Sequence, residues 1–234
     1  MQNKKIKHFA EGAWLLGIVF CSLGVSLSAK SGLGVSMIVA PAYVLYLKIS
    51  QTLSWFTLGM AEYTLQGVLV VLTAVVLRRF KLKYPLCFLT AVIHGFAVDA
   101  WRSLIGAEMA QTALEKGLYC AGGALITAFA IALMLRTYLP QEVYELVVKE
   151  IAEKYSFSMN KVKWIFDISS LLLGIVLMLV LFKSFSFEMI GIGTLVLTVI
   201  NTPLITFFGR ILDKFVSFDP AFKGFYDKFE KILD

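Results

Sequence analysis

Charged residues are scarce in this sequence. Only 16% of its 234 residues are Asp, Glu, Lys or Arg, and 59% are hydrophobic. A soluble domain is nearer a quarter charged and half apolar. Several apolar segments approach the roughly 20 residues that an α-helix needs to cross a bilayer. No run of short alternating segments, as in a membrane β-barrel, is evident. The composition therefore indicates an all-α membrane protein, a single integral membrane domain over residues 1–234.

Metal-binding and catalytic patterns are also lacking. The chain has three cysteines and two histidines, and none has the spacing of a metal or redox motif. There is no nucleophile elbow and no phosphate-binding loop. We therefore expect no metal, no cofactor and no enzymatic activity. An intramembrane acid pair of Glu62 and Asp99 is the one enzymatic alternative that the residue types leave open.

Six apolar segments are long enough to span a membrane. They cover residues 9–29, 55–77, 84–105, 117–135, 162–182 and 189–208. Segment 37–49 is apolar but short, and it predicts a re-entrant or interfacial helix. Segment 139–155 has apolar and charged faces, which predicts an amphipathic helix on the membrane or on the bundle. The tail predicts one or two further interfacial helices, broken near Pro220.

The distribution of positive charge predicts the orientation. Most of the 22 Lys and Arg residues fall in the N-terminal arm, the turn 78–83, the segment 136–163 and the tail from residue 210. Cytoplasmic loops are enriched in such residues, so both termini are expected in the cytoplasm. The net charge of +6 thus reflects membrane topology, and no nucleic-acid partner is expected.

The two halves of the chain resemble each other in the order of their elements. Each has a span with small residues at helical spacing, a proline-bearing short helix, and two more spans. The repeats are expected at 9–106 and 116–210, followed by a cytoplasmic amphipathic tail at 211–234. Three spans per half is an odd number, so the halves must be inverted relative to each other. Inverted repeats are common in secondary transporters, with binding sites near the midplane, although channels and scaffolds also use pseudo-symmetry.

Four stretches carry a resemblance to a known family: GMAEYTLQ, RRFKLKY, FLTAVIHGFAVD and GIGTLVLTVINTPLITFF. They resemble the YczE/YyaS/YitT-type bacterial integral membrane proteins over residues 12–208. The longer YitT-like members carry a soluble C-terminal domain, so the chain is most similar to the short, membrane-only branch. The resemblance implies the fold and a bacterial cytoplasmic (inner) membrane location, and it implies little about mechanism.

Polar residues inside the spans are the candidate site. Ionisable groups at membrane depth are costly and often functional. Their shared depth predicts a polar midplane cavity formed by Glu62, Gln66, His94, Asp99 and Asn201. Glu62 could instead pair with Lys48 or Arg102. A neutral His94 bonded between helices is an alternative to a proton relay.

Two further residues are secondary candidates. Arg102 could pair with Asp99 at a spacing of three residues, and Lys163 could neutralise Asp167. We expect Pro203 to interrupt the last span beside Asn201, which either frees a carbonyl for a ligand or forms a packed kink.

Two functions fit these patterns. The first is a transporter of a small molecule or ion, embedded in the lipid bilayer. The second is a membrane accessory, scaffold or substrate-binding subunit that docks to a separate energising machine. A homodimer is compatible with either.

Overall fold

Six helices are long and apolar enough to cross a membrane in the computed structural model, which describes residues 6–106, 108–221 and 226. They are α1 (Ala10–Ser31), α3 (Leu58–Leu77), α4 (Lys83–Ile105), α5 (Ala113–Met134), α7 (Met159–Phe182) and α8 (Ile192–Phe215). Each corresponds to one predicted span. The expected all-α membrane fold is confirmed.

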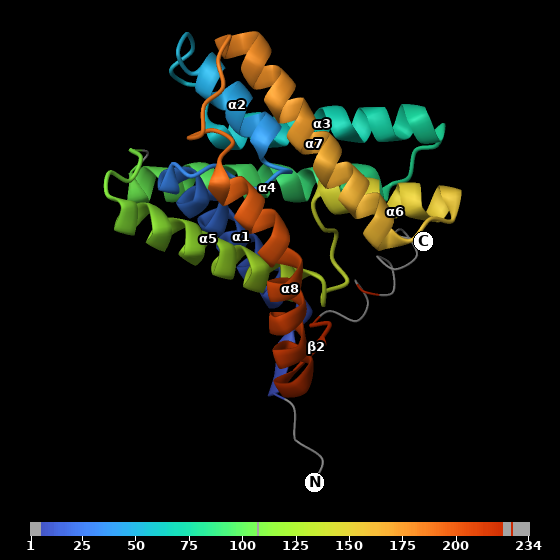
Figure 1. Ribbon diagram of the computed structural model, residues 1–234. Helices are drawn as coiled ribbons and strands as arrows, with labels where there is room; N and C mark the ends of the chain where they lie inside the picture. The colour runs from blue at the N-terminus through green and yellow to red at the C-terminus, as the bar shows by residue number, and fades with distance from the viewer. Residues whose placement is uncertain (1–5, 107, 222–225, 227–234) are drawn as a thin grey trace.

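Two shorter helices separate the long ones. They are α2 (Ala40–Ile49) and α6 (Val143–Tyr155), and each follows the first long helix of its half of the chain. Each short helix packs across the halves, α2 against α7 as well as α3, and α6 against α3 and α4 as well as α7. Figure 1 shows α2 and α6 at separate places along the bundle, with α3 and α7 near both.

The two halves meet along α1 and α5, the most extensive contact between helices in the molecule. Gly24 and Gly123 permit it: a Cβ atom added to either would lie 2.8 Å from the carbonyl oxygen of the other. Gly17 faces Ala130 further along, so the two helices run antiparallel. Small residues that let backbones approach closely are the usual way to pack helices in lipid.

Helix α6 lies alongside α3 and is more deeply buried than its amphipathic pattern predicts. At its start, the backbone N–H of Val143 donates to Gln66 Oε1 at 3.0 Å. At its end, Lys154 Nζ donates to the carbonyl oxygen of Leu77 at 3.1 Å. The two helices therefore run in the same direction. Of the two expected positions, the helix takes the one on the bundle.

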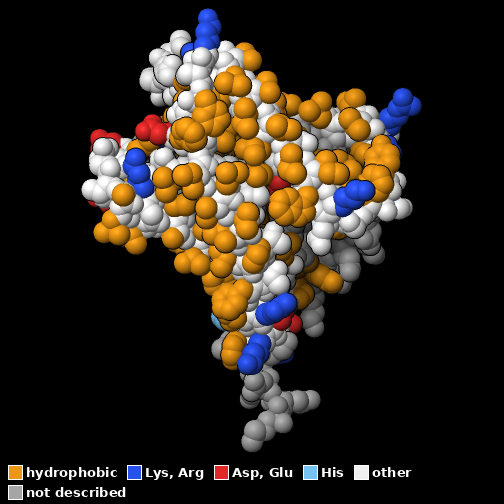
Figure 2. Space-filling model, viewed as in Figure 1, with side chains coloured by type: hydrophobic (Ala, Val, Ile, Leu, Met, Phe, Trp, Pro, Cys, Tyr) orange, Lys and Arg blue, Asp and Glu red, His pale blue; other side chains and the backbone are white. Residues whose placement is uncertain are grey.

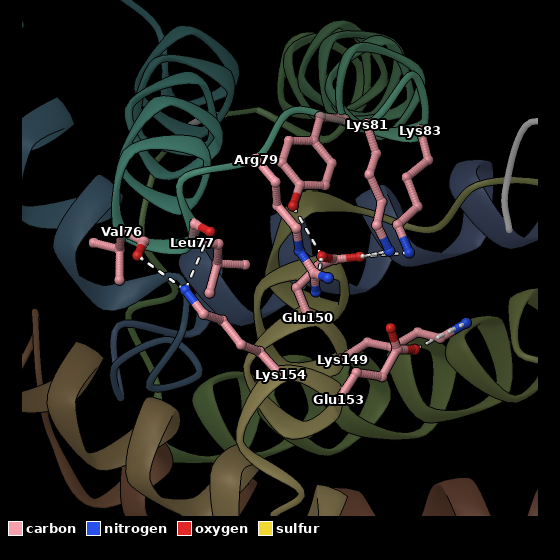
Figure 3. A network of polar contacts seen from close by, with 10 residues as sticks. Val76, Leu77, Arg79, Lys81, Lys83, Lys149, Glu150, Glu153 and Lys154 are labelled. Carbon is pink, nitrogen blue, oxygen red and sulfur yellow. Dashed lines mark hydrogen bonds and ion pairs between the residues drawn. The ribbon is translucent and has the colours of Figure 1, made fainter.

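A buried carboxylate anchors the end of α6 to the basic turn between α3 and α4. Glu150 accepts hydrogen bonds from Arg79 at 2.9 Å, Lys81 at 3.2 Å and the Tyr84 hydroxyl at 2.9 Å, and it forms an ion pair with Lys83. Figure 3 shows these cations converging on Glu150, while the pair Lys149–Glu153 lies apart from them. The basic turn, which predicted the orientation in the membrane, therefore also holds α6 against α3 and α4.

The ends of the described chain lie side by side. Strand β1 (Ile6–Phe9) pairs in parallel with β2 (Val216–Asp219), with Ile6 opposite Val216. The tail prediction was wrong where the structure tests it. Residues 210–215 continue α8, and the next four form a strand because they pair with the N-terminal arm. The rest of the predicted tail helix, 222–225 and 227–234, lies outside the described residues.

The outer surface is strongly apolar. In Figure 2 hydrophobic side chains cover much of the visible face, over α7 and α8 in particular. Only 11% of the apolar window of α7 and 17% of that of α8 is buried within the protein, against 56% for α1. Apolar patches of this extent are rare on soluble monomers, and they are expected for a surface in contact with lipid.

Candidate functional site

A cavity of about 90 Å³ lies at the centre of the bundle. Six long helices line it, together with the segments that lead into α2 and α6 and the first turn of α6. A water molecule needs roughly 10–15 Å³ on the same measure, so the space accommodates several waters or one small solute. Both halves of the chain contribute to its wall.

Glu62 is the most deeply placed acid in this wall. Its side chain is fully buried. Its Oε2 accepts a hydrogen bond of 2.9 Å from the hydroxyl of Tyr144, in the first turn of α6. Its Oε1 is buried and has no hydrogen-bond partner among the residues described. An unpaired carboxylate oxygen at such depth is costly unless a ligand satisfies it.

Gln66 lies one turn further along α3 and holds the start of α6. Its amide nitrogen donates to Glu142 Oε2 at 3.2 Å, and its amide oxygen accepts from the backbone of Val143. The side chain is fully buried but does not line the cavity. Gln66 therefore positions Glu142, which does line it.

His94 projects from α4 into the same cavity. Its Nδ1 lies 3.5 Å from Glu142 Oε1. The side chain is only 2% exposed, and neither ring nitrogen has a hydrogen-bond partner in the described part of the chain. The segment before α6 is held beside it, because the carbonyl oxygen of Pro140 accepts hydrogen bonds from Thr90 and Trp14.

Asp99 and Arg102 lie away from the cavity wall. Asp99 accepts hydrogen bonds from Thr57 Oγ1 at 2.6 Å and from the backbone N–H of Gly59 at 2.9 Å, so it satisfies the start of α3. Arg102 donates to the hydroxyl of Tyr46 and stacks over its ring. The structure therefore places these two residues in contacts between helices, apart from Glu62 and His94.

Asn201 and Asp167 do line the cavity, from α8 and α7. Asn201 Oδ1 and Asp167 Oδ1 are buried and have no hydrogen-bond partner within the described ranges. Lys163 Nζ lies 3.9 Å from Asp167, the pairing that their spacing suggests. Helix α8 continues through Pro203, so the last span is not broken there, and the packed kink stays a prediction.

The sequence analysis missed the contribution of α6 and of the residues just before it. Glu142, Tyr144 and Glu145 all line the cavity, as does Cys21 of α1. The acids were missed because segment 139–155 has the charge pattern of a helix with one face in water. The internal repeat is the one signal that could have indicated them. The first short helix was predicted to be re-entrant or interfacial, and a re-entrant position for the second would place its proline-bearing start inside the bundle.

The cavity carries an excess of acidic groups. Glu62, Glu142, Glu145 and Asp167 face one another across it, against a single lysine, Lys163. Burial raises the pKa of Glu142 to about 7, while the hydrogen bond from Gln66 opposes the shift. Burial also raises the pKa of Glu145, against the charge of Lys163. The site is suited to a positively charged solute, which would relieve these costs.

The fold and the site together define a multi-pass α-helical membrane protein with a buried polar cavity. Within that class, residues 10–210 match the family of unknown function DUF6198, and the chain belongs to this family. It is 26% identical over 204 residues to the uncharacterized protein YyaS of Bacillus subtilis strain 168, covering 85% of this chain and 92% of the relative. The resemblance to YyaS-type proteins is thereby confirmed. No solved structure matches the chain.

Proposed function

We propose that this protein is a transporter that carries a small, positively charged solute across a membrane through the central cavity. The observation that carries the proposal is the unpaired oxygen of Glu62, fully buried in a cavity lined by four carboxylates and one lysine. Buried charges inside membrane proteins mark substrate or ion pathways when they face a shared cavity.

The arrangement of the helices supports this function. The segments leading into both short helices line the cavity, one from each half. Each short helix packs against the third helix of the opposite half, and the two first helices run antiparallel. These are contacts expected of inverted repeats around a midplane site, and alternating access would follow from movement of one half against the other.

Uptake by the purified protein in liposomes tests the proposal. Labelled inorganic cations and small amines would be compared with anions of similar size. Glu62→Gln and Asp167→Asn should each lower cation uptake about tenfold or more, the effect of losing about 1.4 kcal/mol of interaction. Glu153→Gln is the matched control, because Glu153 lies on the exposed face of α6, outside the cavity wall, and pairs with Lys149. Equal uptake of anions, or full uptake by Glu62→Gln, would contradict the proposal.

A second function is a substrate-binding subunit of a larger transport complex. The exposed apolar faces of α7 and α8 favour it, since they would accommodate another membrane protein, or a second copy of this chain, as readily as lipid. The two functions differ in turnover. A binding subunit should retain its solute in equilibrium dialysis and yet move none across liposomes when reconstituted alone.

We also place both ends of the chain in the cytoplasm of a bacterium. The bacterial relative supports the organism class, and the basic turn that contacts Glu150 supports the side. A fluorescent protein that folds only in the cytoplasm, fused to the C-terminus, should fluoresce. A periplasmic reporter active at the same position would reverse the orientation.

A further inference from the structure

Three side chains with metal-binding atoms meet at one point of the cavity wall. They are Cys21 of α1, His94 of α4 and Glu142 before α6, and all three are buried. One potential ligand atom from each lies within 4.8 Å of the others. Cys21 Sγ is 4.0 Å and His94 Nδ1 is 3.5 Å from Glu142 Oε1.

The hydrogen bonding of His94 and Glu142 suits these atoms to binding a ligand. Both ring nitrogens of His94 lack a hydrogen-bond partner within the described ranges, although the side chain is almost fully buried. A buried polar group without a partner costs free energy, and a bound ion is one arrangement that would satisfy it. Glu142 is already oriented for a ligand, because Gln66 holds one of its oxygens and leaves the other toward Cys21 and His94.

The donor set indicates the class of ion. Zinc binds cysteine sulfur at about 2.3 Å and histidine nitrogen or carboxylate oxygen at about 2.0–2.2 Å, which places tetrahedral ligand atoms roughly 3.3–3.6 Å apart. The separation of 3.5 Å between His94 and Glu142 is already in that range, and rotation of the Cys21 side chain would bring its sulfur closer to both. A thiolate and an imidazole select against magnesium and calcium, which prefer oxygen ligands.

We propose that Cys21, His94 and Glu142 bind a divalent transition-metal ion of the zinc class. Three protein ligands leave a fourth coordination position, which a water molecule or a substrate occupies in other three-ligand zinc sites. Glu62 and its unpaired oxygen line the same cavity. The inference that this metal ion is the transported solute rests on the proposed transport function. The inference that the three residues bind a metal rests on their contacts alone.

Binding requires the thiol to lose its proton. Cys21 S–H and the metal ion give a Cys21 thiolate–metal bond and one released proton, while neutral His94 donates its lone pair and the Glu142 carboxylate completes the set. No electron is transferred. The sequence did not predict this site because its members come from three separate elements, and Cys21 and Glu142 are 121 residues apart in the sequence.

Cobalt absorption tests the site directly. The purified, chelator-treated full chain would be titrated with Co²⁺ in detergent. We expect the intense visible bands of tetrahedral Co²⁺ and a thiolate-to-cobalt charge-transfer band, both removed by adding Zn²⁺. Cys21→Ser should lose the charge-transfer band. The matched controls Cys87→Ser and Cys120→Ser should keep it, since these buried cysteines lie outside the cluster.

Zinc-induced thermal stabilisation provides a second readout. Zn²⁺ should raise the melting temperature of the unmutated protein, and His94→Gln should lose that shift, which covers the case in which Cys21→Ser fails to fold. Absence of the charge-transfer band in the unmutated protein, or its retention in Cys21→Ser, overturns the site. Uptake of other cations without metal binding would overturn this inference alone. Metal binding without any uptake would overturn the transport function alone.

Discussion

The hydroxyl of Tyr144 donates a hydrogen bond of 2.9 Å to Glu62 Oε2, and it joins the first turn of α6 to α3. Burial raises the pKa of Tyr144 well above its ordinary value, so the hydroxyl remains a donor. The contact satisfies half of a buried carboxylate and leaves the other half free toward the cavity. The contact joins a short helix to a buried acid of the cavity wall.

Tyr144→Phe should destabilise the protein by about 1–2 kcal/mol, because Glu62 then loses its hydrogen-bond donor in a buried position. Unfolding in mixed detergent micelles, followed by circular dichroism, would measure the loss. Tyr155→Phe at the exposed end of α6 is the control and should change little. Equal stability of both variants would mean that the hydrogen bond contributes nothing net.

Two adjacent glycines in α5 should respond oppositely to alanine. Gly123→Ala places a methyl group against Gly24 and Ser28 of α1, which should cost about 1–3 kcal/mol. Gly122 has no atom within 4 Å of an added Cβ, so Gly122→Ala should be neutral or stabilising by up to about 1 kcal/mol, through helix propensity. The same unfolding assay compares them, and equal effects would contradict the close packing of α1 on α5.

Glu150→Gln should destabilise the protein by about 1–3 kcal/mol, less than a fully buried pair would, because Arg79 and Lys81 remain partly exposed. Burial opposes the charged form, but the bonds from Lys83 and Tyr84 and the charge of Lys83 lower the pKa of Glu150 from 4.5 to about 2.

A folded-state pKa below the unfolded value gives stability that is complete above about pH 4.5 and lost as the pH falls toward 2. The stability gap between the unmutated protein and Glu150→Gln should therefore close across that window. Glu153→Gln is the matched control, because the ion pair of Glu153 with Lys149 lies at the surface of the same helix. A gap that stays constant to pH 2 would mean that the cations do not stabilise the Glu150 carboxylate.

Asp99→Ala should lower stability by about 1–3 kcal/mol, since Gly59 N–H and the Thr57 hydroxyl lose their acceptor at the start of α3. Solute and metal binding should persist, because Asp99 lies outside the cavity wall. Calorimetric binding and unfolding, measured on the same preparation, separate the two effects. If Asp99→Ala lost binding while its stability stayed unchanged, Asp99 would belong to the functional site after all.

The spans could be predicted because a run of about 20 apolar residues has few other stable forms. The site could be predicted only in part. Glu62 and Asp99 are both acids within spans, and the sequence does not tell which faces a cavity and which faces the start of a neighbouring helix. That distinction depends on how α3 and α4 align, which is set by tertiary packing.

The short helix α6 shows a second limit. Its charged residues have the spacing of a solvated face, and that spacing is the same whether the face meets water or buried partners. Glu150 contacts three cations, and Glu142, just before the helix, contacts His94, whereas Lys149 and Glu153 pair with each other at the surface. Periodicity predicts which residues share a face of the helix. Only the structure shows what that face contacts.

The pairing of β1 with β2 brings together two segments that lie far apart in the sequence. Because the strands are parallel, the end of β2 at Asp219 lies beside Phe9, and a linker that runs back along the pair could join Asp219 to Ile6 in place of the residues beyond them. The chain could then be opened between α4 and α5. The resulting circular permutant would begin with α5 and finish with α4, so the second half would be synthesised and inserted first. A permutant that still folds and binds would show that assembly does not depend on which half enters the bilayer ahead of the other.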